Sequence, residues 1–291
     1  MIKNKKTKTG DIIIAVICFI LMFICLLPML NVLARSLSSS YFLIRNEVTL
    51  WPKGWNLDAY KTVLQNQKYT RSMGFTAVLT LGCTLLSLTM TVMCAFPLIF
   101  DQLRGRKLIN GLIVFTMYFS AGTIPNYLLM KNLNLLNTVW VLAIPSCLSI
   151  YNTIIMRSFF FGVPDSLREA AEIDGAGPIR MLAQIYLPLS LPVLATLALF
   201  YAVGRWNGFS DALIYLNDKR SDIYPIQLYL YNILQNATST EVATQEGFST
   251  PGVGETLKMA TVMFATVPIL IVYPWLQRYF VTGTTIGAEK G

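Results

Sequence analysis

Residues 161–192 read FGVPDSLREAAEIDGAGPIRMLAQIYLPLSLP, a polar and patterned stretch between two long apolar runs. Pro164 is expected to end the preceding helix, because proline removes a backbone donor and clashes with the previous turn. Ser166 and Glu169 then have the spacing of a capping box, in which two side chains satisfy free backbone N–H groups at a helix start. The pattern predicts a short helix that runs through Ile173.

Two glycines follow this short helix. Gly175 and Gly177 supply the backbone freedom that a left-handed helix stop requires, and Pro178 suits the first turn of a second helix. The stretch therefore predicts a helix, a turn and a helix outside the lipid. Alanines 170 and 171 remove side-chain bulk from the first helix, so a partner could approach its backbone closely, with apolar contacts from Leu167 and Ile173.

The rest of the chain has the composition of a membrane protein. Of 291 residues, 54% are hydrophobic and 13% charged, and the mean hydropathy is +0.54, whereas soluble domains carry about a quarter charged residues. A membrane-spanning helix needs about 20 apolar residues, and lipid favours helices because they satisfy their own backbone groups. The sequence predicts an all-α integral membrane protein, one transmembrane domain over 1–291, with six spanning helices at about 12–34, 73–100, 108–130, 138–160, 189–216 and 257–280.

Basic residues near the short loops suggest the orientation. Four lysines precede the first window, and Arg104, Arg106 and Lys107 form a short basic loop after the second. Cytoplasmic loops are enriched in Lys and Arg, so we expect a cytoplasmic N-terminus and a cytoplasmic loop at 164–188. The segments 35–72 and 217–256 would then lie outside. The first contains an amphipathic run at 57–64, and the second has a polar centre rich in Thr, Ser, Gln and Gly at 236–254, which indicates a loop. A secretory signal peptide is disfavoured because the first apolar run is too long.

Several kinds of site are excluded. The chain has no histidine, and its five cysteines form no CxxC pair, which argues against metal sites and histidine acid–base chemistry. It has no phosphate-binding P-loop, so ATP must be hydrolysed by another protein if ATP drives it. The net charge of +8 fits positive-inside lysines and an anionic membrane surface better than nucleic acid.

The helix–turn–helix stretch also carries a recognisable motif. Glu169-Ala170-Ala171 is followed after three residues by Gly175, and after nine more by Ile185, Leu187 and Pro188. This pattern resembles the EAA motif of ABC importer permeases. The similarity extends over nearly the whole chain to the carbohydrate-type permeases, and within them to the LplC- or YtcP-like branch, related to MalG. Supporting stretches are NLDAY at 56–60, GTIPNY at 122–127, RSFF at 157–160, GRWN at 204–207 and LIYL at 213–216.

The resemblance implies a function and partners. Residues 169–175, with Asp174 among them, would form a coupling helix in a groove of an ATP-binding subunit, and Ile185, Leu187 and Pro188 would complete the coupling loop. The chain would be a multi-pass bacterial cell membrane protein that binds no cofactor itself. Its expected partners are a second homologous permease, a dimer of subunits that hold ATP and Mg, an extracellular solute-binding lipoprotein, and a sugar or oligosaccharide substrate.

Candidate substrate contacts lie near helix breaks. Trp206, Asn207, Phe209 and Tyr215 combine aromatic faces, which pack on sugar C–H surfaces, with an amide for hydroxyls. Residues Asn126 and Tyr127 are weaker candidates. The alternatives are interhelical packing and an interfacial aromatic belt. Arg205 interrupts a membrane-length run, so it either serves function or extends to the interface.

Two other functions stay open. A permease for a non-sugar solute would share the EAA motif. An ion-coupled secondary transporter would be expected to bury ionisable residues at mid-membrane and often to show repeated halves. Cutting the sequence at its ionisable residues leaves six long windows free of Asp, Glu, Lys and Arg, at 12–34, 72–100, 108–130, 132–156, 181–204 and 259–277, which disfavours it.

Overall fold

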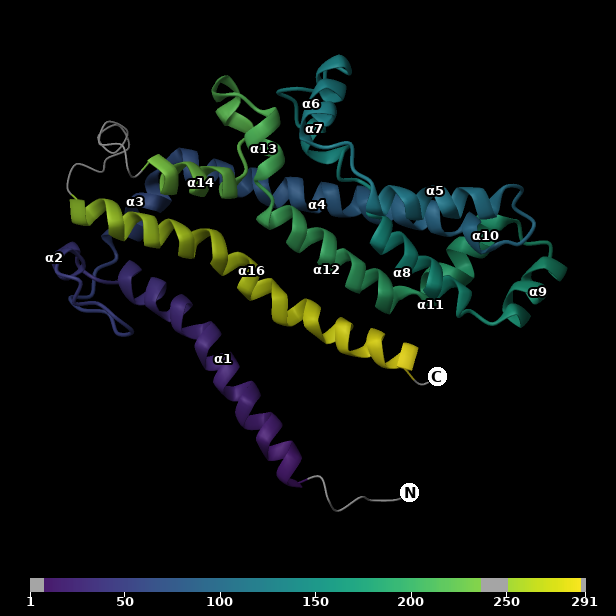
Figure 1. Cartoon of the computed structure of the whole chain (residues 1–291), viewed down its shortest axis with the longest axis horizontal. Helices are drawn as coiled ribbons and strands as arrows, with labels where there is room; N and C mark the ends of the chain where they lie inside the picture. The colour runs from purple at the N-terminus through teal and green to yellow at the C-terminus, as the bar shows by residue number, and fades with distance from the viewer. Residues whose placement is uncertain (1–7, 237–250, 289–291) are drawn as a thin grey trace. The chain divides into compact units, whose positions relative to one another are not determined.

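The computed structural model describes residues 8–236 and 251–288. Within this part of the chain every regular element is a helix, and the only strand-like pairing is an isolated bridge between Ser38 and Trp55. The helices, labelled in Figure 1, divide into two compact units by their contacts. One contains residues 1–70 and 230–267, and the other contains residues 71–229 and 268–291.

The first unit contains the long apolar helix α1 (Lys8–Ser36) and the short helices α2 (Ser40–Ile44) and α3 (Asp58–Gln65). Arg35 at the end of α1 forms an ion pair with Glu255, near the start of α16 (Pro251–Ala288). The hydroxyls of Ser36 and Tyr60 lie 2.7 Å apart and join α1 to α3. The amphipathic run predicted at 57–64 is therefore α3, tied to the end of α1.

The second unit holds most of the remaining elements. Their order along the chain is α4 (Gln67–Ala95), η1 (Pro97–Ile99), α5 (Arg106–Tyr118), α6 (Thr123–Asn132), α7 (Trp140–Ala143), α8 (Ile150–Phe161), α9 (Asp165–Ile173), α10 (Pro178–Met181), η2 (Leu182–Tyr186), α11 (Leu187–Leu189), α12 (Leu191–Asn207), α13 (Ser210–Tyr215) and η3 (Asp218–Ile223). Helix α14 (Ile226–Asn236) and helices α4 and α16 run across the division between the units.

Three helices in the described residues are long and apolar enough to cross a membrane, in segments 10–36, 67–99 and 254–272. The number rises to five if each of two bent pairs counts as one span. The first, second and sixth predicted windows thus correspond to continuous helices. Six crossings stay a prediction.

The other windows are interrupted. In the window 108–130, α5 and α6 meet at 115°, and Gly122 between them has φ 88° and ψ 173°, a conformation that essentially only glycine adopts. The window 138–160 is divided between α7 and α8, and α7 ends two residues before Pro145, which has no N–H to extend it. The window 189–216 is divided at Gly208 between α12 and α13.

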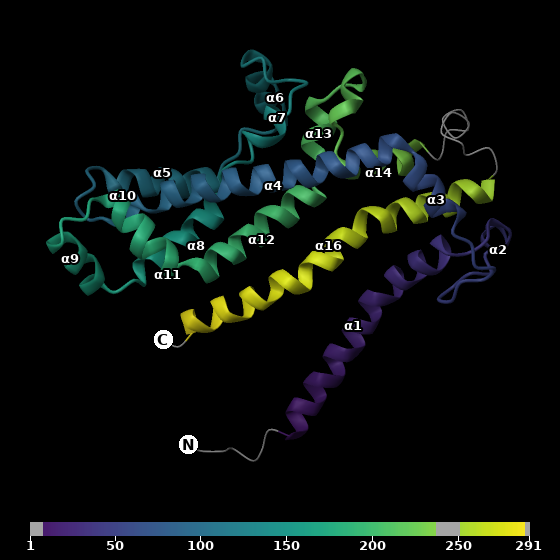
Figure 2. The ribbon, with the colours of Figure 1, turned by 180° about the vertical axis from the view of Figure 1, so that it is seen from behind.

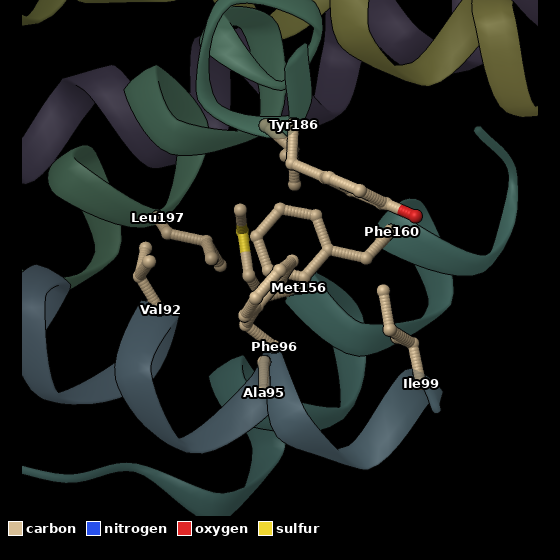
Figure 3. Packing of buried hydrophobic residues seen from close by; sticks show 9 residues of the cluster. Val92, Ala95, Phe96, Ile99, Met156, Phe160, Tyr186 and Leu197 are labelled. Carbon is tan, nitrogen blue, oxygen red and sulfur yellow. The ribbon is translucent and has the colours of Figure 1, made fainter. Parts of the chain in front are cut away.

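Helices α4, α8 and α12 share one core in the second unit (Figure 3). Large apolar side chains from these helices meet Tyr186, which comes from the segment that precedes α12. The buried members are Val92, Ala95, Phe96, Ile99, Met156, Phe160, Tyr186, Val193 and Leu197. This core joins the helix–turn–helix stretch to the long helices.

Some expectations fall partly outside the described residues. Three of the N-terminal lysines used for orientation, at positions 3, 5 and 6, lie in residues 1–7. The polar centre of the outer segment, predicted as a loop over 236–254, lies mostly in residues 237–250. Its last four residues are already helical, because α16 begins at Pro251, a residue favoured in the first turn of a helix.

Candidate functional site

Helix α9 begins without the predicted capping box. It starts at Asp165, its N-cap residue is Pro164, and no side chain accepts a hydrogen bond at the cap. Ser166 already lies within the helix, so it cannot act as the cap. Instead, the carboxylate of Asp165 lies in the first turn, where the helix dipole favours negative charge, 3.2 Å from the guanidinium of Arg168.

The end of α9 is a Schellman motif, in which two backbone bonds close the last turn. The N–H of Ala176 donates to the carbonyl of Ala171 at 2.9 Å, and the N–H of Gly175 donates to that of Glu172 at 3.1 Å. Gly175 has φ 72°, so the left-handed stop is present at the predicted glycine. Gly177 has φ −70° and needs no such freedom, and Pro178 begins α10 as expected.

The residues of the EAA motif do not all face the same way. Glu169, Ala170, Asp174 and Gly175 are exposed. Ala171 is buried within its own chain, so it cannot offer the close-fitting surface that the sequence suggested for both alanines. Of the two alanines, only Ala170 is exposed and able to offer that surface.

Exposed apolar side chains surround this motif. Ile173 is 86% exposed and Ile179 is 84% exposed, and Leu167 is exposed as well. Both α9 and α10 lie at one end of the second unit in opposite views (Figures 1 and 2). The sequence pattern indicated Leu167 and Ile173 but not Ile179, although an isoleucine directly after a helix-starting proline in a polar turn is a signal that could have indicated it.

The second half of the motif forms an irregular helix. Residues Leu182–Tyr186 form a π-helix, and α11 and α12 then meet at a bend of 82°. Pro188 and Pro192 explain the bend, because neither can donate the backbone hydrogen bond that a straight helix needs there. Ile185 and Leu187 are partly buried and pack against the shared core, whereas Pro188 is exposed.

Tyr186 is the buried link between this segment and the long helices. Its ring packs edge-on against Phe96 of the α4–η1 junction at 5.2 Å and against Phe160 of α8 at 5.5 Å between ring centroids. Phe96 and Phe160 also pack edge-on with each other at 6.0 Å. Tyr186 occupies the variable position of the I-x-L-P motif, which is why the motif did not indicate it.

The predicted substrate residues fall into two groups. Asn126 and Tyr215 line a cavity of 320 Å³ together with Ser120, Gly122, Thr123, Val141, Pro145, Ser146, Asp211 and Ile214. Tyr127 lies beside it, its ring stacked on that of Tyr215 with centroids 6.3 Å apart. The structure therefore brings the two weaker candidates, Asn126 and Tyr127, together with Tyr215.

Trp206, Asn207 and Phe209 line neither this cavity nor a larger neighbouring one. Trp206 is buried, and the exposed Asn207 donates its side-chain amide to the carbonyl of Val203 at 3.0 Å. Phe209 is half-buried. Asn207 is thus bonded to its own helix and exposed, so the structure does not show the interhelical packing that was its alternative.

The larger cavity has a volume of 480 Å³ and lies within the second unit. Helices α4, α8 and α12 supply most of its wall, with the residues Cys83, Ser87, Ser146, Ser149, Asn152, Phe200, Tyr201, Gly204, Arg205, Gly208, Ser210 and Asp211. Arg205 is only 9% exposed and forms an ion pair with Asp211. The arginine therefore does not extend to an interface, and its carboxylate partner, six residues away, was missed from the sequence.

Within residues 8–236 and 251–288, no three His, Cys, Asp or Glu side chains are grouped so that they could hold a metal ion.

Comparison with protein families gives a match over residues 79–286 to the model described as "Binding-protein-dependent transport system inner membrane component". The chain belongs to this family. The matched residues include the helix–turn–helix stretch and the residues that line both cavities.

Individual relatives cover almost the whole chain. It is 42% identical to the protein LplC of Bacillus subtilis over 92% of this chain and 90% of that protein. The permease YtcP of the same organism, named for polygalacturonan and rhamnogalacturonan transport, is 37% identical over 94% and 96%. A solved bacterial ABC transporter "involved in the import of the acidic polysaccharide alginate" contains a chain 31% identical to this one, with a TM-score of 0.86 over 96% of this chain and 99% of that chain.

Proposed function

We propose that this chain is the membrane-spanning permease subunit of an ATP-driven importer for a sugar or oligosaccharide. It belongs to a family of membrane transport components, and most of the relatives with named substrates, including the more similar ones, carry saccharides, while a relative 28% identical is named for sn-glycerol-3-phosphate. These names favour a sugar over a non-sugar solute. They also favour a pump with a separate ATP-binding subunit over an ion-coupled secondary transporter.

The observation that carries the coupling role is the exposed end of the second unit. Helices α9 and α10 present Ile173 and Ile179 almost fully to solvent, beside the exposed Glu169 and Ala170. Apolar side chains so exposed on a polar segment are suited to contact with another protein. We assign this surface to a groove of the ATP-binding subunit, with Glu169 as its polar contact.

Movement of this segment would reach the long helices through Tyr186. A packed interior transmits displacement because it has few voids and low compressibility. The ring of Tyr186 touches Phe96 and Phe160, so a shift of the π-helix would move the ends of α4 and α8 together. Closure of the dimer of ATP-binding subunits, driven by ATP, would thereby change the side of the membrane to which the pore is open.

The complete transporter would contain further subunits. A second permease would complete the pore, two ATP-binding subunits would hold ATP and Mg, and an extracellular binding lipoprotein would deliver the saccharide. The chain would cross the bacterial cell membrane six times with its N-terminus in the cytoplasm. The substrate path would pass the cavity lined by Asn126 and Tyr215. Trp206, Asn207 and Phe209, the other predicted contacts, line neither cavity.

Uptake by membrane vesicles that contain the complete transporter tests this proposal. Glu169→Lys and Gly175→Pro should leave the protein inserted but abolish ATP-dependent uptake, since Gly175 has φ 72° and proline is fixed near −65°. Asp58→Lys is the control, because it reverses an exposed carboxylate on α3, outside the proposed coupling segment. Normal uptake by both motif variants, or uptake driven by an ion gradient without ATP, would refute it.

A further inference from the structure

The larger cavity has the size and polarity of a ligand site. Its 480 Å³ fall within the range of about 300–1,000 Å³ that small-molecule sites occupy. It adjoins the cavity of 320 Å³, since Ser146 and Asp211 line both. Most of the lining side chains carry a hydroxyl, amide or charged group, and the aromatic rings of Phe200 and Tyr201 complete the wall.

Two of these polar side chains are buried and have no partner. Ser87 is 3% exposed and Asn152 is 5% exposed. Neither the Ser87 hydroxyl nor the Asn152 side-chain amide makes a hydrogen bond to any residue in 8–236 or 251–288. Their polar atoms are not sealed away from the cavity that they line. Buried polar groups are normally paired, because leaving them unpaired costs free energy, so these two point to a ligand.

The charged groups in the wall are already paired with the protein. Arg205 Nη1 donates to the Leu142 carbonyl at 3.0 Å and to Asp211. Its Nη2 donates to the Gly208 carbonyl at 3.2 Å and to Asp211 Oδ1 at 3.0 Å. A guanidinium has two N–H groups on each Nη, so all four are used. The fifth N–H of the guanidinium, on Nε, has no partner but is buried. A carboxylate in the cavity would therefore find neither a free pair of donors nor an uncompensated positive charge.

From this arrangement we infer that the cavity holds an uncharged sugar unit and discriminates against a uronate. Ser87 and Asn152 hydrogen-bond its hydroxyls, and the Arg205–Asp211 pair keeps the wall electrically neutral. Among residues 8–236 and 251–288, these two are the charged residues that line the cavity. The inference rests on the proposed function and adds the charge class of the substrate, which differs from the acidic polysaccharide named for the solved relative.

Matched pairs of trisaccharides test the charge preference directly. The complete transporter, in lipid nanodiscs without ATP or the binding protein, is titrated with labelled galacto-, manno- and gluco-trisaccharides. Each is compared with the uronate chain of the same stereochemistry, which replaces CH₂OH by COO⁻. We expect at least one neutral chain to bind about tenfold tighter than its uronate. The reason is that the uronate carboxylate would enter the cavity without an uncompensated positive charge to pair with. Uronates that bind as tightly as their neutral partners, or no binding by any neutral chain, would overturn the inference.

Substitutions locate the binding in this cavity. Ser87→Ala and Asn152→Leu should each weaken neutral trisaccharide binding roughly threefold to tenfold, the effect of one or two lost hydrogen bonds. Thr84→Val is the matched control, because Thr84 lies on the same helix as Ser87, has a buried hydroxyl without a partner and does not line the cavity. Equal binding by all three variants would refute the assignment.

A charge change gives an independent readout. Asp211→Asn removes the compensation of Arg205, so the ratio of uronate to neutral affinity should rise about tenfold or more. An unchanged ratio in a correctly inserted variant would contradict the inference. If ATP drives no saccharide uptake at all, the proposed function fails. If ATP drives uptake of uronates that also bind as well as neutral chains, only the inference about charge fails.

Discussion

The two glycines of the turn after α9 provide a matched pair of substitutions. Gly175 has φ 72°, and Gly177 has φ −70° and ψ 164°. A Cβ atom added at either position meets no atom within 4 Å. Gly175→Ala and Gly177→Ala therefore differ in backbone conformation and not in steric contact.

The difference can be estimated from the backbone alone. Both substitutions restrict the unfolded chain to the same degree, worth about 0.4–1 kcal/mol in favour of folding. Only Gly175→Ala must hold an L-residue in the left-handed region, which costs about 1–2 kcal/mol. The shared contribution cancels in the comparison, so the turn in Gly175→Ala should be about 1–2 kcal/mol less stable than in Gly177→Ala.

Amide hydrogen exchange measures this at the turn itself. The N–H of Ala176 donates to the Ala171 carbonyl across the Schellman motif, so its exchange reports opening of the stop. After correction for intrinsic rates, we expect exchange roughly 5- to 30-fold faster in Gly175→Ala than in Gly177→Ala. Equal protection in the two variants, or faster exchange in Gly177→Ala, would refute the role of the left-handed stop.

Three further predictions concern other parts of the chain. Tyr186→Ala should lower the free energy of unfolding by about 3–5 kcal/mol because it empties a packed aromatic site. Tyr186→Phe keeps the ring and should lower it less. Equal losses of unfolding free energy in the two variants would contradict this prediction. Ile179→Asp should leave stability unchanged but weaken binding of the ATP-binding subunit about fivefold or more; unaltered binding would contradict the docking surface. The hydrogen bond from Arg220 lowers the pKa of Asp222, so this pair stabilises the fold above the ordinary Asp pKa of about 3.9 and loses its effect as pH falls through the lowered value. NMR titration of Asp222 should show a higher pKa in Arg220→Gln, and an unshifted pKa would contradict the assignment.

Local rules predicted the helix–turn–helix stretch well. The end of α9 at Ile173, the left-handed Gly175 and the start of α10 at Pro178 depend only on neighbouring residues. The capping box failed because α9 starts directly after Pro164, which places Ser166 inside the helix. The spacing alone could not show which residue would be the cap.

Features that depend on tertiary contacts could not be predicted from neighbouring residues in the sequence. Ala170 and Ala171 are identical in sequence terms, and only packing shows that one is exposed and the other buried. The apolar window 108–130 satisfies a length criterion, which does not detect the turn at Gly122.

The candidate substrate residues show the same limit. Trp206 and Asn207 were chosen for their chemical type, but they line neither cavity. The polar cavity wall comes from α4, α8 and α12, and residues such as Ser87 and Asn152 look ordinary in an apolar sequence. Their significance depends on burial without a hydrogen-bond partner, which no sequence pattern records.

The central claim is that α9 and α10 meet the ATP-binding subunit in the cytoplasm. Labelling of a single cysteine at Ile173, in a chain whose five native cysteines are replaced, tests it most directly. A membrane-impermeant thiol reagent should label this position in inverted vesicles and not in right-side-out vesicles, and the bound ATP-binding subunit should protect it. A cysteine at the exposed Trp51 of the outer segment should show the opposite sidedness. Labelling of position 173 from outside, or equal labelling with and without the ATP-binding subunit, would contradict the account.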